Sequence, residues 1–296
     1  MNPFNLECIV RHLIRGWAAG SIIALLAVTP GFAETVVFPH EGSVYFSISD
    51  GKQPGLFVCE PSKPKGPAHF LPPRRIGDTV KNLMASFPEG KMRLVSPRWE
   101  HGFHLQTGLA EKQAVQLPAP LPASSLWALA DYNGDGQSDA IVFSLSADDA
   151  KAQIFYGRAD GSYAAPFVFQ IEGKDFDATG LRSPHFVNLD DDDDLDFIHL
   201  DALGRLIYYE NSNTNSEPLY GAGRILACRA DKETLLAAMD AVSPFDWNAD
   251  GHTDLIIVTR DGAIGCLPHS GAGKDGVPIF LPMVSLIVIP TAPASP

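Results

Sequence analysis

The sequence predicts an all-β protein, a β-propeller of about five four-stranded blades, and three observations lead to this fold. A nine-residue acidic loop recurs three times, starting at residues 131, 188 and 246, at intervals of 57 and 58 residues. A short apolar run follows each loop. The chain also contains 26 Gly and 24 Pro among its 296 residues, as expected of many strands joined by turns. A repeat of this length is typical of one propeller blade.

The three acidic loops share one pattern, with Asp or Asn at positions 1, 3 and 5 and Asp at position 9. These positions hold Asp131, Asn133, Asp135 and Asp139 in loop 1, Asn188, Asp190, Asp192 and Asp196 in loop 2, and Asp246, Asn248, Asp250 and Asp254 in loop 3. Calcium takes roughly six to eight oxygen ligands, which alternate residues of a tight loop can supply. The pattern therefore predicts about three Ca²⁺ ions, one in each loop.

Positions 6 and 7 differ more between the loops. Position 7 is expected to offer its backbone carbonyl to the ion, which leaves the side chains of Gln137, Asp194 and His252 free to vary. Position 6 is glycine in loops 1 and 3, where a sharp turn favours positive φ. Asp193 replaces it in loop 2, and Asp tolerates the left-handed region. Loop 2 is thus the weaker match, and a solvated acidic turn stays open as its alternative.

An EF-hand is the competing type of calcium loop, and the sequence argues against it. That loop needs a bidentate Glu at position 12 between two helices, whereas position 12 here is Val142, His199 or Ile257. The runs after the loops instead predict buried strands. These runs are Ala140 to Phe143, Phe197 to Leu200 and Leu255 to Val258.

Each interval between loops has room for about four strands and their turns. The repeats are expected at residues 131–187, 188–245 and 246–296, with an Asp160-Gly161 hairpin turn in the first. Their third and fourth strands are expected at Gln153 to Gly157 and Pro166 to Phe169, at Leu206 to Tyr209 and Gly223 to Leu226, and at Ala263 to Cys266 and Pro278 to Leu281.

Residues 34–130 are expected to form divergent blades without calcium loops. In one, Tyr45 to Ser49 aligns with Val142 to Ser146, Phe57-Val58 with Ile154-Phe155, and Phe70 with Phe167. In a weaker one the strands are Arg93 to Val95, Phe103 to Leu105 and Ala114 to Leu117. Two short helices are predicted as insertions, at Thr79 to Phe87 and Lys232 to Val242, with Asp78 and Asp231 as caps.

With these loops and strands, the chain resembles the FG-GAP and VCBS repeat family, whose propeller blades carry calcium loops. The resemblance depends on Asp131 to Asp139 with the strand that follows, on Tyr156 to Tyr163, and on the two later loops. The Phe-Gly and Gly-Ala-Pro signatures are absent, so the chain is more similar to the bacterial exported branch than to integrins. The resemblance implies a propeller with calcium in its blade loops, used for adhesion, ligand binding or as an accessory domain, and it implies no reaction.

The first 33 residues have the pattern of a secretory signal peptide. Arg11, His12 and Arg15 precede a 12-residue apolar stretch from Trp17 to Val28, and Gly31-Phe32-Ala33 resembles a cleavage site. The apolar stretch is short for a membrane-spanning helix. We therefore expect a secreted or periplasmic protein, with residues 34–296 as a single propeller domain and no membrane span after signal removal.

Charge and cysteine content restrict the partners and the redox chemistry. The net charge is −13, with 12 acidic residues in the three loops, which argues against nucleic acid as a partner. Cys59, Cys228 and Cys266 remain after signal removal, and they allow either one disulfide or none.

The first functional hypothesis is a binding or adhesion module for a protein or glycan ligand, with calcium stiffening the blade loops. The alternative is a secreted hydrolase or lyase acting on polysaccharide, with a pocket on the propeller face and Glu100 and His101 as acid and base. A polar turn is the plainer interpretation of the segment from Trp99 to His104. The chain has no Gly-x-Ser-x-Gly, glycine-rich phosphate loop or His-Glu-x-x-His motif.

Two further expectations concern packing. Loop position 2 holds Tyr132, Leu189 and Trp247, which are expected to pack against a neighbouring blade, with stacking on a sugar ring as the alternative. An incomplete propeller would close only with a partner, and the segment from Leu286 to Ile289 would then be an exposed edge strand. The chain would in that case form an oligomer.

Overall fold

The structure is a computed structural model. It describes residues 35–48, 54–61, 70–71, 73–86, 92–104, 108–120, 122, 124–146, 149–192, 194–226, 239–260, 263–273 and 275–288. The predicted signal peptide, Asp193, Cys228 and the predicted helix as far as residue 238 lie outside these residues.

The described residues form five four-stranded antiparallel sheets, here called blades 1 to 5. Blade 1 contains β1 (Thr35–His40), β2 (Ser43–Ile48), β3 (Gly55–Cys59) and β4 (Arg74–Gly77), and blade 2 contains β5 (Met84–Ser86), β6 (Arg93–Ser96), β7 (Trp99–His104) and β8 (Gly108–Ala114). Blade 3 contains β9 (Ser125–Ala130), β10 (Asp139–Ser144), β11 (Ala152–Phe155) and β12 (Phe167–Val168), and blade 4 contains β15 (Arg182–Val187), β16 (Asp196–Leu200), β17 (Leu206–Tyr209) and β18 (Arg224–Ile225). Blade 5 contains β19 (Met239–Phe245), β20 (Asp254–Thr259), β21 (Ala263–Leu267) and β24 (Val284–Val288). The predicted propeller of five four-stranded blades is confirmed.

Two additional hairpins lie outside the blades. One pairs β13 (Gln170–Ile171) with β14 (Lys174–Asp175) after blade 3. The other pairs β22 (His269–Ala272) with β23 (Pro278–Phe280) and is inserted between the third and fourth strands of blade 5. The prediction that Pro278 to Leu281 forms the outer strand of this blade is therefore wrong, because β24 takes that place beside β21.

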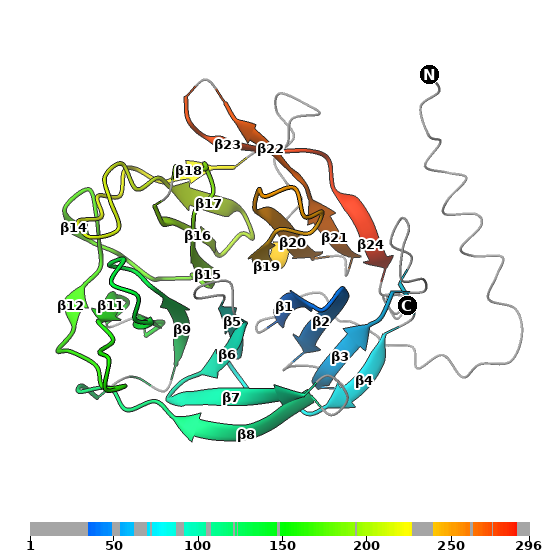
Figure 1. The fold of residues 1–296 in the computed structure, drawn as a ribbon, viewed down its shortest axis with the longest axis horizontal. Coiled ribbons are helices and arrows are strands. Elements are labelled where there is room, and N and C mark those ends of the chain that lie inside the picture. Colours follow the sequence, from blue (N-terminus) through cyan, green and yellow to red (C-terminus); the bar gives the residue numbers. More distant parts are fainter. Residues whose placement is uncertain are drawn as a thin grey trace, which may run out of the picture.

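The five blades form a ring in which the first strand of each blade lies nearest the centre (Figure 1). Alternate side chains of a strand point to opposite faces of its sheet, so each blade packs against a neighbour on both faces. Blades 1 and 2 share an apolar core that includes Leu56 and Leu94. Further cores join blades 2, 3 and 4, and blades 4 and 5.

The ring closes within one chain, because blades 1 and 5 also share a core. Val37 and Phe46 of blade 1 pack there with Val258 and Cys266 of blade 5, and β1 lies against β19. A partner is therefore not needed to complete the propeller. Cys59 lies in the same core, and both Cys59 and Cys266 are unpaired thiols whose burial raises their pKa to about 12.

The predicted helix from Thr79 to Phe87 is wrong in the part that the structure describes. Asn82 has a left-handed backbone with φ of 54°, and Met84 to Ser86 pair with β6 as strand β5. The second predicted helix is wrong at its end, because Met239 begins β19. In both segments Leu, Met and Ala favour a helix locally, but pairing with the adjacent strand and burial in the ring prevail.

The predicted strands of blades 1 and 2 need smaller corrections. Strand β8 ends at Ala114, before most of the predicted segment. Phe70 forms an isolated bridge with Pro61 and belongs to no strand. The blades also begin earlier than the predicted repeats, since each acidic loop follows the first strand of its blade.

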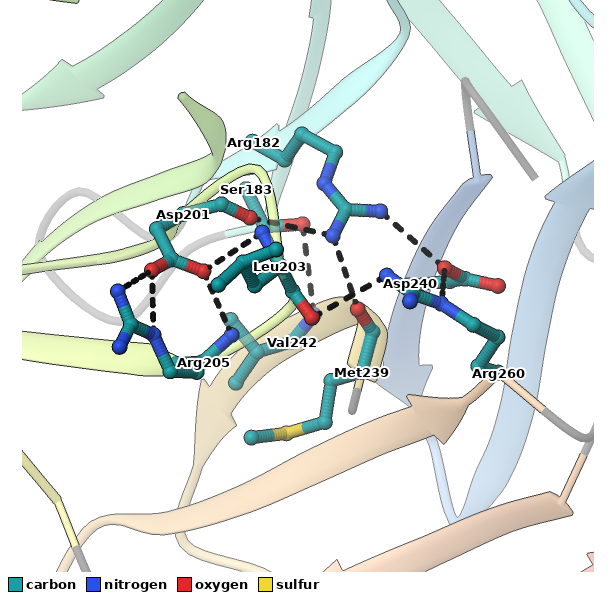
Figure 2. A network of polar contacts seen from close by, with 9 residues as sticks. All are labelled: Arg182, Ser183, Asp201, Leu203, Arg205, Met239, Asp240, Val242 and Arg260. Carbon is teal, nitrogen blue, oxygen red and sulfur yellow. Dashed lines mark hydrogen bonds and ion pairs between the residues drawn. The ribbon is translucent and has the colours of Figure 1, made fainter. Parts of the chain in front are cut away.

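A partly buried polar network joins blades 4 and 5 at the starts of their innermost strands (Figure 2). Arg182 donates to a carboxylate oxygen of Asp240 at 3.1 Å and to the carbonyl oxygens of Asp201 and Met239 at 3.2 Å. Arg260 lies 3.7 Å from the same oxygen of Asp240, which is almost fully buried. Since the acidic loops follow the opposite ends of these strands, the network and the loops fix the two ends of the same blade interface.

Candidate metal centres

The three acidic loops occupy the same place in three consecutive blades. Loop 1 joins β9 to β10, loop 2 joins β15 to β16, and loop 3 joins β19 to β20. The three loops therefore lie on the same side of the ring, where the innermost strand of each blade ends. The fold brings together the 15 predicted ligand residues as three separate groups, one in each loop.

Position 9 has the same role in all three loops. Asp139, Asp196 and Asp254 are 0% exposed. One carboxylate oxygen of each accepts from the backbone N–H of position 2, at 2.8, 3.1 and 3.0 Å respectively. The other oxygen accepts from the N–H of the second residue beyond the third strand, which is Gly157, Asn211 or His269, at 2.7, 3.0 and 2.7 Å. This aspartate thus ties its loop to the blade.

Loops 1 and 3 have matching internal hydrogen bonds. In loop 1 the two oxygens of Asp131 accept from the N–H groups of Asp135 and Gly136, both at 2.9 Å. The amide of Asn133 donates to Asp135 at 2.9 Å, and the N–H of Gln137 donates to Asp135 at 2.8 Å. The equivalent bonds in loop 3 run from Asp250 and Gly251 to Asp246, and from Asn248 and His252 to Asp250, at 2.8 to 3.1 Å.

Loop 2 differs, because its carboxylates are less well satisfied. One oxygen of Asp190 and one of Asp194 are buried and have no hydrogen-bond partner within the described part of the chain. The other oxygen of Asp190 accepts from the hydroxyl of Tyr208 at 3.1 Å. The side chain at position 7 was expected to be free to vary, but Asp194 is buried here and turns towards the other carboxylates of the loop.

The electrostatics of the loops show the same difference. Burial raises the pKa of Asp196 to about 8. Burial and the charge of Asp192 raise the pKa of Asp194 to about 7 and that of Asp190 to about 6. In loops 1 and 3, burial raises the pKa of Asp139 to about 6 and also raises the pKa of Asp254. The pKa of the exposed Asp250 is lowered, mainly by the N–H of His252.

The donor set fits a hard divalent cation such as calcium. Each loop presents three carboxylates and one side-chain amide at positions 1, 3, 5 and 9, and calcium prefers such oxygen ligands. A carboxylate oxygen has two lone pairs, so an N–H bond leaves capacity for a cation. The unpartnered oxygens of Asp190 and Asp194 are the best candidates for cation ligands, because a buried carboxylate without a partner is costly unless a counter-charge is present.

The residues at loop position 2 link each loop to the next blade, as predicted. The Tyr132 ring meets the Phe186 ring of β15 edge-on, at 5.4 Å between centroids. Leu189 is buried in the core between blades 4 and 5. The Trp247 ring lies 5.7 Å from that of Phe70, which follows β3 of blade 1. Order in a loop is therefore coupled to packing between blades.

Loop position 4 also has a conserved geometry within this chain, which the sequence reasoning missed. Gly134, Asp191 and Ala249 have φ values of 69°, 68° and 59°. The left-handed region costs roughly 1–2 kcal/mol for a residue with a Cβ. Gly134 was a signal for this geometry, but the non-glycine residues in the other two loops concealed it. Position 6 has positive φ at Gly136 and Gly251, as predicted.

Neighbouring loops are connected at two places, one through Asn215 and one by a direct polar contact. The side-chain oxygen of Asn215, in the segment after β17, accepts from the N–H of Leu195 at 2.7 Å, and its Cβ lies beside Gly134 of loop 1. His252 of loop 3 lies 2.7 Å from a carboxylate oxygen of Asp191 in loop 2. The three loops are consequently connected, and their exposed polar residues form a polar surface over blades 3, 4 and 5.

The alternative catalytic pair does not assemble into one site. Arg93 forms two hydrogen bonds with Glu100, at 2.8 and 2.5 Å, whereas His101 is buried and lies 2.7 Å from the hydroxyl of Ser96. The two residues are adjacent in β7, so their side chains point to opposite faces of the sheet. Burial lowers the pKa of His101. Each side chain is therefore occupied by a structural contact.

Searches against protein-family models and curated proteins found no match. Among solved structures, an α-L-arabinofuranosidase from Clostridium thermocellum aligns over 85% of this chain and 94% of its own, with 9% identity and a TM-score of 0.49. A periplasmic gluconolactonase from Pseudomonas aeruginosa aligns over 81% of both chains, with 12% identity and a TM-score of 0.38.

A Tc holotoxin pore from Photorhabdus luminescens aligns over 79% of this chain, with 16% identity and a TM-score of 0.37. This chain spans only 11% of the length of that toxin chain. These likenesses concern the fold alone and carry no inference about activity. Over the residues that the structure describes, we find no helix with the length and apolar character of a membrane span.

Proposed function

We propose that this protein is an exported calcium-binding β-propeller of the FG-GAP and VCBS type, which serves as a binding or adhesion module for a protein or glycan. The observation that carries the proposal is the threefold repetition of one loop architecture. Position 9 makes the same two backbone contacts in blades 3, 4 and 5, and each loop carries Asp or Asn at positions 1, 3 and 5.

The proposed role of calcium is structural. Asp131, Asn133, Asp135 and Asp139 would hold the ion in loop 1, with the equivalent residues in loops 2 and 3, and the carbonyls of Gln137, Asp194 and His252 would complete the three sites. An ion there neutralises carboxylates that otherwise repel one another. Because position 2 packs into the next blade, each ion also stabilises a blade interface.

The stabilisation expected from calcium binding can be calculated from typical affinities. Extracellular calcium modules have dissociation constants around 10⁻⁴ to 10⁻³ M. At a tenfold excess of free calcium, one site adds about 1.4 kcal/mol to the free energy of unfolding. Three such sites together contribute an amount comparable with much of the net stability of a domain.

The test is thermal unfolding of the purified protein in Ca²⁺, in Mg²⁺ and in EDTA, beside the triple variant Asp135→Ala, Asp192→Ala, Asp250→Ala. We expect a rise in midpoint that is specific to Ca²⁺ and absent from the variant. A midpoint that responds equally to Mg²⁺, or that rises equally in the variant, would show that the loops are acidic turns. Isothermal titration then counts the ions, with about three per chain as the expected result.

Export is tested separately. We expect the protein in the periplasm or the medium, with Glu34 as its first residue after signal cleavage. Fractionation followed by N-terminal sequencing measures this. Recovery of the uncleaved chain in the cytoplasm would contradict the export part of the proposal and leave the calcium part standing.

A further inference from the structure

Two histidines and an aspartate meet where loop 2 faces loop 3. Asp191 is position 4 of loop 2, His252 is position 7 of loop 3, and His269 begins β22 in blade 5. One nitrogen of each ring and one carboxylate oxygen all lie within 4.8 Å of one another. The three residues come from segments that are 61 and 17 positions apart in the sequence, so only the closed blade interface unites them.

His269 is the side chain in this group with the strongest need for a ligand. It is 6% exposed, and neither of its ring nitrogens has a hydrogen-bond partner among the residues that the structure describes. A buried polar group without a hydrogen-bond partner destabilises the folded state. A cation bound to this ring would give one of the two nitrogens a partner.

The backbone of His269 is held firmly in place. Its N–H donates to the buried carboxylate of Asp254 at 2.7 Å, and β22 pairs with β23 at Phe280. The ring of His252 meets that of His269 edge-on, with 5.5 Å between centroids. A ligand side chain on such a fixed backbone is oriented before the ion arrives, which lowers the entropic cost of binding.

A simple ion pair accounts for only part of the geometry. His252 lies 2.7 Å from Asp191, and both are partly exposed, so this pair alone is worth little. It leaves the two ring nitrogens of His269 without a partner. A metal bound between all three side chains would give one ring nitrogen of His269 a partner and would also use the close approach of His252 to Asp191.

The donor set differs from that of the calcium loops. Two imidazoles and one carboxylate suit a borderline ion such as Zn²⁺, whereas calcium takes oxygen ligands. The proposed calcium ligand of His252 is its backbone carbonyl, and Asp191 at position 4 is not a calcium ligand in the loop pattern. The two kinds of site therefore use different atoms and can be filled together.

We infer that Asp191, His252 and His269 bind one Zn²⁺-class ion that clamps loop 2 of blade 4 to loop 3 of blade 5. Three protein ligands leave a fourth position of a tetrahedral zinc ion open to water or to a donor group of a bound molecule. The site thus lies within the polar loop surface on which the proposed module would meet its ligand, although the inference does not depend on that module.

The test is isothermal titration of the untagged protein with ZnCl₂ in millimolar Ca²⁺, with the visible absorption of bound Co²⁺ as a second readout. The variants are His269→Gln and Asp191→Asn, and the matched control is His40→Gln, which changes a histidine of blade 1. We expect one Zn²⁺ per chain, with affinity lowered about tenfold or more in both variants and unchanged in the control.

Three outcomes would overturn the inference: absence of Zn²⁺ binding, an affinity that neither variant lowers, and displacement of Zn²⁺ by Ca²⁺. Asp191 lies in an exposed turn, so Asp191→Asn keeps the test decisive if His269→Gln does not fold. A metal that binds with equal affinity to the Asp135→Ala, Asp192→Ala, Asp250→Ala variant would support the zinc site even if the calcium proposal failed.

Discussion

Loops 1 and 3 can be compared directly with loop 2, because all three occupy the same position in consecutive blades. Loops 1 and 3 have glycine at position 6, exposed carboxylates at position 5 and a set of internal hydrogen bonds that satisfies position 1. In loop 2, Asp190 and Asp194 each keep a buried oxygen without a partner. Loop 2 is the weakest match to the pattern and has the strongest electrostatic need for a cation.

The comparison separates two functions within one loop pattern. Position 9 serves the fold in all three loops, since both its oxygens hold backbone N–H groups. The remaining carboxylates are the other proposed cation ligands, and their environment would decide how much stability is gained on binding. We therefore expect a common effect of substitution at position 9 and a loop-dependent effect of substitution elsewhere.

The largest effect is expected for Asp139→Ala and Asp254→Ala. Each leaves two buried backbone N–H groups without an acceptor, at roughly 1–3 kcal/mol each, so the free energy of unfolding should fall by about 2–5 kcal/mol. Asp196→Ala should cost less, because it also removes the most unfavourable buried charge. Urea unfolding in EDTA at pH 8 measures the three values.

Asp149→Ala is the control for this series, since Asp149 is exposed and forms an ion pair with Lys151 at 2.9 Å. We expect it to change stability by less than about 0.5 kcal/mol. Equal losses for Asp196→Ala and Asp254→Ala would remove the proposed electrostatic difference between the loops.

The second effect has the opposite sign. In EDTA at pH 8, Asp194→Asn should raise the free energy of unfolding by about 1–3 kcal/mol, because a neutral amide replaces a buried carboxylate whose ionisation the fold disfavours. The same variant should gain less from calcium, since one negative charge is missing. Asp135→Asn in loop 1 is the matched control, and its exposed site should show a change below about 0.5 kcal/mol in EDTA. A destabilised Asp194→Asn protein would contradict this account of loop 2.

The pH dependence of the calcium-free protein follows from the same groups. The pKa values of Asp196 and Asp194, about 8 and about 7, are raised above the ordinary value for Asp. The folded state therefore binds protons that the unfolded state releases, and its stability is lost as pH rises through these values. Between about pH 6.5 and 8.5 the unfolding midpoint in EDTA should fall with rising pH.

This window avoids a contrary contribution from His185. Burial lowers the pKa of His185 to about 4, so its contribution rises with pH between about 4 and its ordinary value near 6.5. Saturating calcium should flatten the slope, because the ion replaces the protons. A slope that is unchanged in Asp194→Asn would place its origin outside loop 2.

The repeat interval and the residue types at positions 1, 3, 5 and 9 were sufficient to predict the propeller and the grouping of the loop residues. The burial of individual carboxylates could not be predicted, because it depends on the neighbouring blade. Asp194 and Gln137 share position 7, and only the packing around blade 4 turns Asp194 inward. His269 was also beyond prediction, since its neighbours His252 and Asp191 come from two other segments.

The errors have a common physical origin. Met84 to Ser86 and Met239 to Val242 contain residues that favour a helix locally, and pairing with the next strand overrides that preference. The hairpin of β22 and β23 was taken for an outer strand, because the apolar residues of Pro278 to Phe280 are buried here as well. Local patterns identified the repeated elements well and the insertions between them poorly.

The smallest effect concerns position 4, where the loops share a left-handed backbone but not a residue type. Ala249→Gly should raise the free energy of unfolding by up to about 1 kcal/mol, because glycine adopts φ of 59° without a Cβ penalty. Gly134→Ala should lower it by about 1 kcal/mol, and its new Cβ would lie 3.2 Å from the Cβ of Asn215. Urea unfolding with and without calcium measures both. If calcium holds this turn, the two shifts persist in the bound protein, whereas shifts seen only in EDTA would mean that the ion selects a different backbone.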